Sequence, residues 1–186
     1  MKKLKRLAAV LLAGIMALAL LTACSGSDAG NPEFEANVES VYQEALKTKF
    51  EKELENGEAF TNDAAIKALA IEHIEDKHDA KSLNKETIWK TDGDVKKTVV
   101  RQVLLCYTSA NGTLVPRFYE AATTQTITPS VMDLLTLHNA VKTLKKKAED
   151  EGMTLELTAL GVGTRTFGGK TYIAIGFELT NTTPQN

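Results

Sequence analysis

The chain is poor in cysteine and carries no excess of basic charge. Among its 186 residues only Cys24 and Cys106 are cysteines. Removing residues 1–23 leaves 18 basic against 24 acidic residues, a formal charge of −6. An acidic chain of this kind argues against a nucleic-acid partner, which requires a basic face. If Cys24 is modified, Cys106 is the one remaining thiol, and no internal disulfide can form even where the compartment allows it.

The chain also lacks an apolar run long enough for a confident membrane span, which needs about 20 apolar residues. Its apolar run at residues 7–21 is followed at once by polar sequence. A basic start, an apolar segment of roughly 7 to 15 residues and small residues at the cut are typical of a secretory signal. We therefore predict a signal peptide over residues 1–23, with a basic start formed by Lys2, Lys3, Lys5 and Arg6.

The residues at the predicted cut are Leu21-Thr22-Ala23-Cys24, and they resemble the lipobox of bacterial lipoproteins. This resemblance implies that Cys24 becomes the mature N-terminus and carries a thioether-linked diacylglycerol. Two acyl chains give stable anchoring, whereas a single chain binds only marginally. The expected location is the bacterial cell membrane, with the domain on the extracytoplasmic side and the membrane as a partner through Cys24. An ordinary signal with an incidental cysteine is the alternative.

Composition behind the cut divides the chain into a tether and one domain. The stretch "SGSDAGNP" after Cys24 disfavours regular structure, so residues 24–33 are predicted to be the lipidated cysteine and a flexible tether. The remaining length suits one domain with an ordinary core. We predict a single globular domain over residues 34–180 and a flexible tail over 181–186.

Three segments have helical periodicity. The first begins at Phe34 and ends near Asn56-Gly57; the second begins at Thr61 or Asn62 as its cap, and the two are expected to pack together. The third begins at Ser130, where Asp133 approximates a capping box, and stops at Gly152. The predicted apolar stripes are Phe34, Val38, Val41, Tyr42, Ala45, Leu46, Phe50 and Leu54; Ile66, Leu69, Ala70 and His73; and Val131, Leu134, Leu135, His138, Val141, Leu144 and Ala148.

Strand patterns fill the rest of the domain. Asp92-Gly93, Asn111-Gly112 and Gly168-Gly169 are turn signals between β-rich runs, and Pro116 indicates an edge strand or a bulge. Alternate apolar residues from Ile173 to Leu179 predict a strand with one buried face. The sequence therefore predicts an α+β domain, with an antiparallel sheet of about four to five strands packed with three helices, in the order ααββ(β)αββ.

Sequence motifs for catalysis or metal binding are weak. "GVGTRTFGGKT" has the wrong glycine spacing for a phosphate-binding loop and is followed by a strand, so a hairpin is favoured. In "IEHIEDKHD", His73 and His78 lie about 140° apart on a helix and cannot grip one ion together. Glu75 and His78 share a face in a spacing used by di-iron bundles, but only one copy is present. A solvated helix face is the preferred interpretation, and neither a metal nor another cofactor is predicted.

Other residues suggest a site only faintly. His73 and His138 each interrupt an apolar stripe, which is more typical of histidines at the edge of a core than of a catalytic pair. Cys106 is expected to be a small packed hydrophobe. The low-probability metal candidates are Glu75, His78, His73 and His138, and the aromatic residues that would line a binding surface, if they are not core, are Trp89, Tyr107, Phe118 and Tyr119.

Two further stretches resemble secreted CAP-type domains. "AFTNDAAIKALA" is similar to the start of their second helix, and "LGVGTRTFGGKTYIAIGF" is similar to their closing hairpin. The histidines and glutamates of that family's central cleft have no recognisable motif in this chain. The resemblance therefore implies an α/β/α sandwich whose cleft chemistry has been lost.

Together these features predict a membrane-anchored lipoprotein whose domain is a non-catalytic binding or interaction module. Its ligand would be an unknown envelope protein or a small molecule. One alternative is an envelope hydrolase-like or metal-dependent enzyme that uses His73, His78 or His138. Another is an accessory subunit of a membrane complex, for which a large exposed apolar patch would be the sign.

Overall fold

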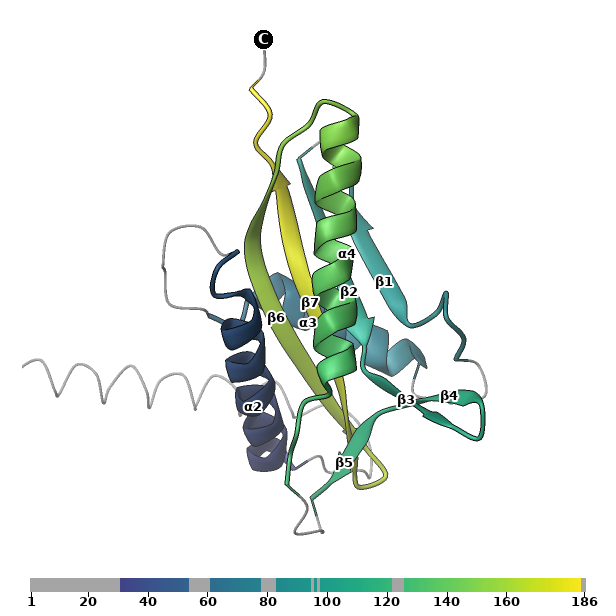
Figure 1. Ribbon diagram of the computed structural model, residues 1–186. Helices are drawn as coiled ribbons and strands as arrows, with labels where there is room; N and C mark the ends of the chain where they lie inside the picture. The colour runs from purple at the N-terminus through teal and green to yellow at the C-terminus, as the bar shows by residue number, and fades with distance from the viewer. Residues whose placement is uncertain are drawn as a thin grey trace, which may run out of the picture.

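The computed structural model describes residues 31–53, 61–77, 83–94, 96, 98–121 and 126–184. The predictions for the signal peptide, Cys24, Leu54, the Asn56-Gly57 helix stop and His78 lie outside these ranges. The described chain has three helices, a five-stranded antiparallel sheet and a two-stranded sheet, which confirms the α+β class (Figure 1). The helices are α2 (Pro32–Phe50), α3 (Ala64–Lys77) and α4 (Val131–Asp150).

The main sheet is built around its last strand. The strand β7 pairs on one side with β6 and on the other with β2, and β5 pairs with β7 beyond the end of β2. The strand β1 pairs with β2, while β3 and β4 form the separate hairpin. The strands are β1 (Trp89–Gly93), β2 (Val99–Leu105), β3 (Tyr107–Ala110), β4 (Thr113–Pro116), β5 (Phe118–Glu120), β6 (Leu155–Phe167) and β7 (Lys170–Asn181).

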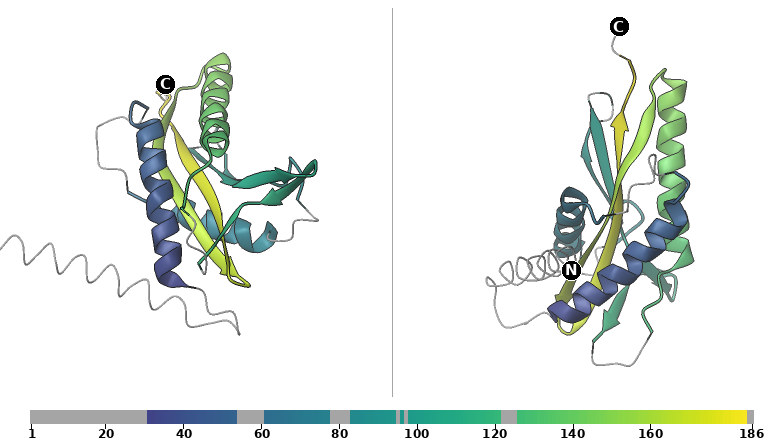
Figure 2. Two further views of the ribbon diagram at one scale, coloured as in Figure 1. Left: turned by 60° about the horizontal axis from the view of Figure 1, so that its bottom comes forward. Right: turned by 90° about the vertical axis from the view of Figure 1, so that its left-hand side faces the viewer.

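Helices cover both faces of this sheet. The right-hand view of Figure 2 shows α2 and α4 on one side and α3 on the other. The alternate residues of β7 that were predicted to share a face are all fully buried, so that prediction is confirmed. They are Ile173, Ile175, Phe177 and Leu179.

The predicted packing of the first two helices against each other is wrong. The helix α3 instead packs on the sheet face opposite α2, where Gly161, Gly163 and Gly176 leave room for Ile66 and Ala70. A Cβ atom at Gly163 would lie 2.9 Å from the Lys67 carbonyl oxygen, so the helix backbone approaches the strand directly. A helical stripe in a sequence shows that a face is buried but not against which element.

The helix α2 follows its predicted stripe closely. The side chain of Asn31 accepts a hydrogen bond from the Phe34 N–H at 3.1 Å, and Pro32 occupies the first turn, where its missing N–H costs nothing. The helix therefore begins inside the segment predicted as tether. Its core residues are Val38, Tyr42, Leu46 and Phe50.

The cap of α3 differs from the prediction. The Asp63 carboxylate accepts the N–H groups of Ala65 and Ile66, both at 2.9 Å, so Asp63 is the cap rather than Thr61 or Asn62. The side chain of Asn62 instead donates to the Val162 carbonyl and accepts from the Val162 N–H, at 2.9 and 2.7 Å. The Asn62 amide thus pairs with β6 as a backbone peptide group would.

The helix α4 is rotated relative to its predicted stripe. Val141 and Ala148 are buried as predicted, and Leu134 and Leu144 pack partly buried against the core. Asp133 and Leu137 are buried as well, whereas Val131 and Leu135 are exposed. Ser130 occupies the cap position without a side-chain cap hydrogen bond, so the predicted capping box is wrong, because the Asp133 carboxylate faces inward. The stop at Gly152 is confirmed by its positive φ of 77° and its N–H bond to Glu149.

The predicted hairpin turns are largely confirmed. Asn111-Gly112 and Gly168-Gly169 connect β3 to β4 and β6 to β7, and all four residues have positive φ. Gly93 also has positive φ, but it ends β1 and a loop follows it. Pro116 is the last residue of β4, a strand paired on one side only, as expected. Hydrogen bonds between Thr182, Thr183 and Thr154 continue past the predicted end of the domain.

Candidate functional site

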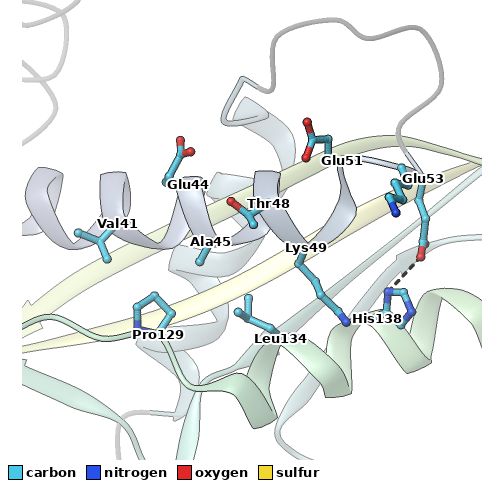
Figure 3. A pocket seen from close by; sticks show the side chains of 11 residues that line it. Val41, Glu44, Ala45, Thr48, Lys49, Glu51, Glu53, Pro129, Leu134 and His138 are labelled. Atoms are coloured by element: carbon cyan, nitrogen blue, oxygen red, sulfur yellow. Dashed lines mark ion pairs between the residues drawn. The ribbon is translucent and has the colours of Figure 1, made fainter.

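A groove of about 850 Å³ lies between α2 and α4 (Figure 3). From α2, Val41 and Ala45 face Pro129, Leu134 and His138 across the groove. The inner stripe of α2 is turned to the sheet, so these two residues come from the neighbouring strip of the same helix. The other lining residues are polar: Glu44, Thr48, Lys49, Glu51, Lys52 and Glu53. The groove therefore has an apolar floor and a rim that carries both signs of charge.

Apolar surface continues beyond the groove along the start of α4. Val131 and Met132 are 69% and 68% exposed, and Leu135 is 36% exposed. Val131 and Leu135 are one helical turn apart, next to the Leu134 side chain that lines the groove. Groove and exposed residues together form one surface, which we call the α4 surface: Pro129, Val131, Met132, Leu134 and Leu135.

His138 and Glu53 meet at one end of the groove. Nδ1 of His138 lies 3.1 Å from Oε1 of Glu53, although the ring N–H is not aligned for a hydrogen bond. The ring also packs against Phe50, with centroids 5.6 Å apart. Desolvation lowers the pKa of His138, which the carboxylate of Glu53 opposes and Lys49 and Lys142 reinforce. The imidazole is therefore mainly neutral at pH 7 and can accept or donate one proton.

An ion pair lies beneath the first turn of α4. The Arg117 guanidinium donates to the Asp133 carboxylate at 3.1 Å and to the Tyr107 carbonyl at 2.9 Å. Burial raises the pKa of Asp133, while Arg117 and a hydrogen bond from the Cys106 thiol act in the opposite direction. Burial also raises the pKa of Cys106 well above its usual value, so the sulfur stays a protonated thiol. Cys106 is fully buried, which agrees with the prediction that it is a small packed residue.

Two tyrosines extend this buried network to α2. The hydroxyl groups of Tyr42 and Tyr119 lie 3.2 Å apart, and Tyr119 donates to the Thr128 carbonyl at 2.6 Å. Burial raises the pKa of Tyr42 far above its usual value, so it is neutral at all physiological pH values. These residues connect α2, β5 and α4, and α2 and α4 are the two walls of the groove. We call them the inner polar cluster: Tyr42, Cys106, Arg117, Tyr119 and Asp133.

The structure separates the sequence-predicted site residues. His138 lies at the groove, whereas His73 is buried on α3, which covers the other face of the sheet. Glu75 forms an ion pair with Arg165 at 3.0 Å, as expected for a solvated helix face. Over the described ranges, no three His, Cys, Asp or Glu side chains converge as a metal site. His73, Glu75 and His138 are therefore not parts of one site.

The aromatic candidates also have different environments. Tyr119 belongs to the inner polar cluster, Trp89 and Tyr107 are partly buried against the core, and Phe118 is 39% exposed. The stretch "GVGTRTFGGKT" is the β6–β7 hairpin, as predicted, and no helix follows it. Neither the groove nor the inner polar cluster was predicted, because no contiguous pattern in the sequence marks either one.

Comparisons with protein-family models, with curated proteins and with solved structures found no match. The lipobox and the resemblance to CAP-type domains therefore remain predictions from the sequence. Within the part of the chain that the structure describes, no helix is both long and apolar enough to cross a bilayer.

Proposed function

We propose that the chain is a lipid-anchored extracytoplasmic protein that binds an apolar segment of an envelope protein at the α4 surface. The observation that carries the binding role is the continuity of the groove with Val131, Met132 and Leu135. Exposed apolar residues next to a concave, partly apolar groove are typical of protein interaction sites. The exposed residues extend the surface beyond the groove itself, which favours a protein segment over a small molecule.

The sequence supports the anchoring role. The basic start, the apolar run and the Leu21-Thr22-Ala23-Cys24 motif precede the first described helix by only a short polar stretch. With two acyl chains on Cys24, the domain would be held close to the bilayer. The same anchoring would suit an accessory subunit of a membrane complex, which is a special case of the proposed binding role.

The anchoring is tested with the variant Cys24→Ala of the full chain in its host. We expect the wild type to incorporate labelled palmitate and to fractionate with membranes. We expect the variant to incorporate none, because the thioether cannot form. Equal palmitate labelling of both chains would contradict the anchor.

The binding role is tested by photo-cross-linking from residue 132 in living cells. We expect one dominant cross-linked partner, which is lost when Ala45→Trp fills the groove. Lys146→Trp is the matched control, because Lys146 is exposed further along α4 and does not line the groove. If the cross-link survives Ala45→Trp, or is lost equally in the control, the α4 surface is not the binding site.

An envelope hydrolase-like or metal-dependent enzyme is the second candidate function. One observation favours it, namely that Nδ1 of His138 lies 3.1 Å from Oε1 of Glu53 in the groove, where rotation of the ring would let the carboxylate accept its N–H and orient the imidazole as a base. Native mass spectrometry of the chain purified from its host tests this candidate. A co-purifying metal or small molecule that is lost in a folded His138→Ala variant would favour the enzyme over the binding module.

A further inference from the structure

Three aromatic rings and a lysine gather at one end of the sheet. The ring centroids of Phe118 and Tyr172 are 5.9 Å apart, and those of Phe167 and Tyr172 are 6.2 Å apart. The Lys170 ammonium lies 4.4 Å from the centroid of the Phe118 ring, a cation–π contact. We call these four residues the aromatic tip: Phe118, Phe167, Lys170 and Tyr172.

The sheet register explains why the rings share one face. Phe118 is paired with Tyr172 and Phe167 with Lys170, so the four side chains stand on the same side of β5, β6 and β7. Phe167 and Tyr172 are partly buried, and Phe118 is 39% exposed, so all three rings remain accessible to solvent. An aromatic surface with an adjacent cation matches the chemistry of a lipid headgroup region, where aromatic rings and lysines are enriched.

The aromatic tip also lies at the end of the domain where the described chain begins. Figure 1 shows the start of α2, the strand β5 and the β6–β7 turn together at the lower end, with the end of α4 and the C-terminus at the upper end. The right-hand view of Figure 2 shows the same arrangement. Eight residue steps separate Cys24 from Pro32, which span at most about 28 Å when fully extended. An anchor at Cys24 therefore keeps this end of the domain close to the bilayer.

We infer that the aromatic tip docks onto the membrane surface and fixes the orientation of the anchored domain, with α2 and α4 rising from the bilayer. This inference rests on the proposed lipid anchor at Cys24. The nearby charges are of both signs, because Lys170 is paired with Glu120 across β5 and β7, and Arg165 forms its ion pair with Glu75. The docking surface is thus the boundary between the headgroups and the acyl chains of zwitterionic lipid, with no requirement for anionic lipid.

The experiment uses the full lipidated chain in phosphatidylcholine vesicles whose acyl chains carry bromine close to the headgroups, where it is a contact quencher of tryptophan at the interface. The native Trp89 is replaced in every sample by Trp89→Phe. The reporter is Phe118→Trp at the aromatic tip, and the matched control is Asp150→Trp, at the far end of α4. We expect bromine to remove most of the emission of the reporter and little of the emission of the control. Replacing part of the lipid with phosphatidylglycerol should leave both results unchanged.

The outcomes separate this inference from the proposed anchor. A lipidated chain that remains on the vesicles while its reporter is as bright as in unbrominated lipid overturns the inference alone. A chain that carries no lipid and stays off the vesicles overturns both the anchor and the inference. If Phe118→Trp unfolds the domain, Tyr172→Trp supplies a second reporter on the same surface, with the same expected quenching.

Discussion

At the scale of single residues, the Arg117–Asp133 pair is unequally buried. Asp133 is 2% exposed and the Arg117 side chain 25% exposed. Burial destabilises the charged carboxylate of Asp133 more than the nearby guanidinium of Arg117 stabilises it. The pKa of Asp133 is therefore raised, although Arg117 acts to lower it. Desolvation lowers the pKa of Arg117, but the Asp133 carboxylate acts with Tyr42 and Cys106 in the opposite direction, and the pKa is raised overall. The pair therefore holds the start of α4 in place, although burial disfavours the charged form of Asp133.

We expect Asp133→Ala to lower the free energy of unfolding by about 3 kcal/mol, because Arg117 and the Cys106 thiol lose their buried acceptor. Asp133→Asn should cost less, since it keeps an oxygen acceptor without the desolvated charge. Urea denaturation of each variant measures the difference. Asp150→Ala is the control and should change stability by less than about 0.5 kcal/mol, since Asp150 is exposed. Equal costs for the two Asp133 variants would show that the oxygen acceptor is unimportant.

The lowered pKa of His138 makes a second prediction at this scale. Because desolvation places its folded pKa below the value of 6.5 for the free group, the unfolded chain binds more protons between these two values. The stabilisation by the neutral ring is complete above pH 6.5 and is lost as the pH falls through the lowered pKa. Unfolding free energies measured from pH 7 downward should fall more steeply for the wild type than for His138→Gln. If the unfolding free energies of the two proteins fall equally with pH, the pKa of His138 is not lowered by folding.

At the scale of elements, the contact between α3 and the sheet depends on glycines in β6. A Cβ at Gly163 would lie 2.9 Å from two backbone atoms of α3, the Lys67 carbonyl oxygen and the Ile71 nitrogen. We expect Gly163→Ala to cost about 2 kcal/mol, because the helix backbone must move to relieve the overlap. Gly161→Ala meets mainly the Ile66 side chain and should cost less. Thermal unfolding compares them, and the reverse order would show that α3 is more loosely seated than the structure indicates.

The elements that the sequence predicted correctly are those with local determinants. The Asn111-Gly112 and Gly168-Gly169 turns require positive φ, and the core stripe of α2 repeats with helical period, so a short window contains each signal. The face of the sheet on which each helix packs is not local. It follows from glycines at alternate positions of β6 and one in β7, which become adjacent only when the strands pair.

The candidate site was missed for a related reason. Asp133 stands three residues after Ser130, the spacing of a capping box, and only the position of Arg117 in the folded sheet turns that carboxylate inward. The groove is lined by residues beside the inner stripes of α2 and α4, so it follows from the distance between the two helices. His138 was recognised as unusual in its stripe, but its partner Glu53 could not be identified from the sequence.

At the scale of the whole molecule, Cys106 reports on global unfolding. It is fully buried in the core, and its thiol pKa is raised by burial, so the reactive thiolate forms only when the domain opens. In the Cys24→Ala chain, where it is the one cysteine, we expect alkylation more than about a thousandfold slower than for a free thiol, given a typical domain stability. Labelling followed by mass spectrometry measures the rate. Rapid labelling without denaturant would reveal local opening near α4.

The pairing of Asn62 with Val162 has a consequence for how copies of this domain meet one another. The strand β6 is an outer strand of the sheet, and an unpaired outer strand is a template for aggregation. Asn62 occupies both backbone groups of Val162, and the Asp63 N–H binds the Leu160 carbonyl. Nζ of Lys67 on α3 also lies 2.7 Å from Oε2 of Glu39 on α2, so an ion pair joins the two helices that lie on opposite faces of the sheet. The edge strand on the opposite side of the sheet, β1, is only five residues long and carries Lys90 and Asp92. Both outer strands are therefore poor templates for strand exchange between copies of this domain, because β6 is blocked around Val162 and β1 is short and charged.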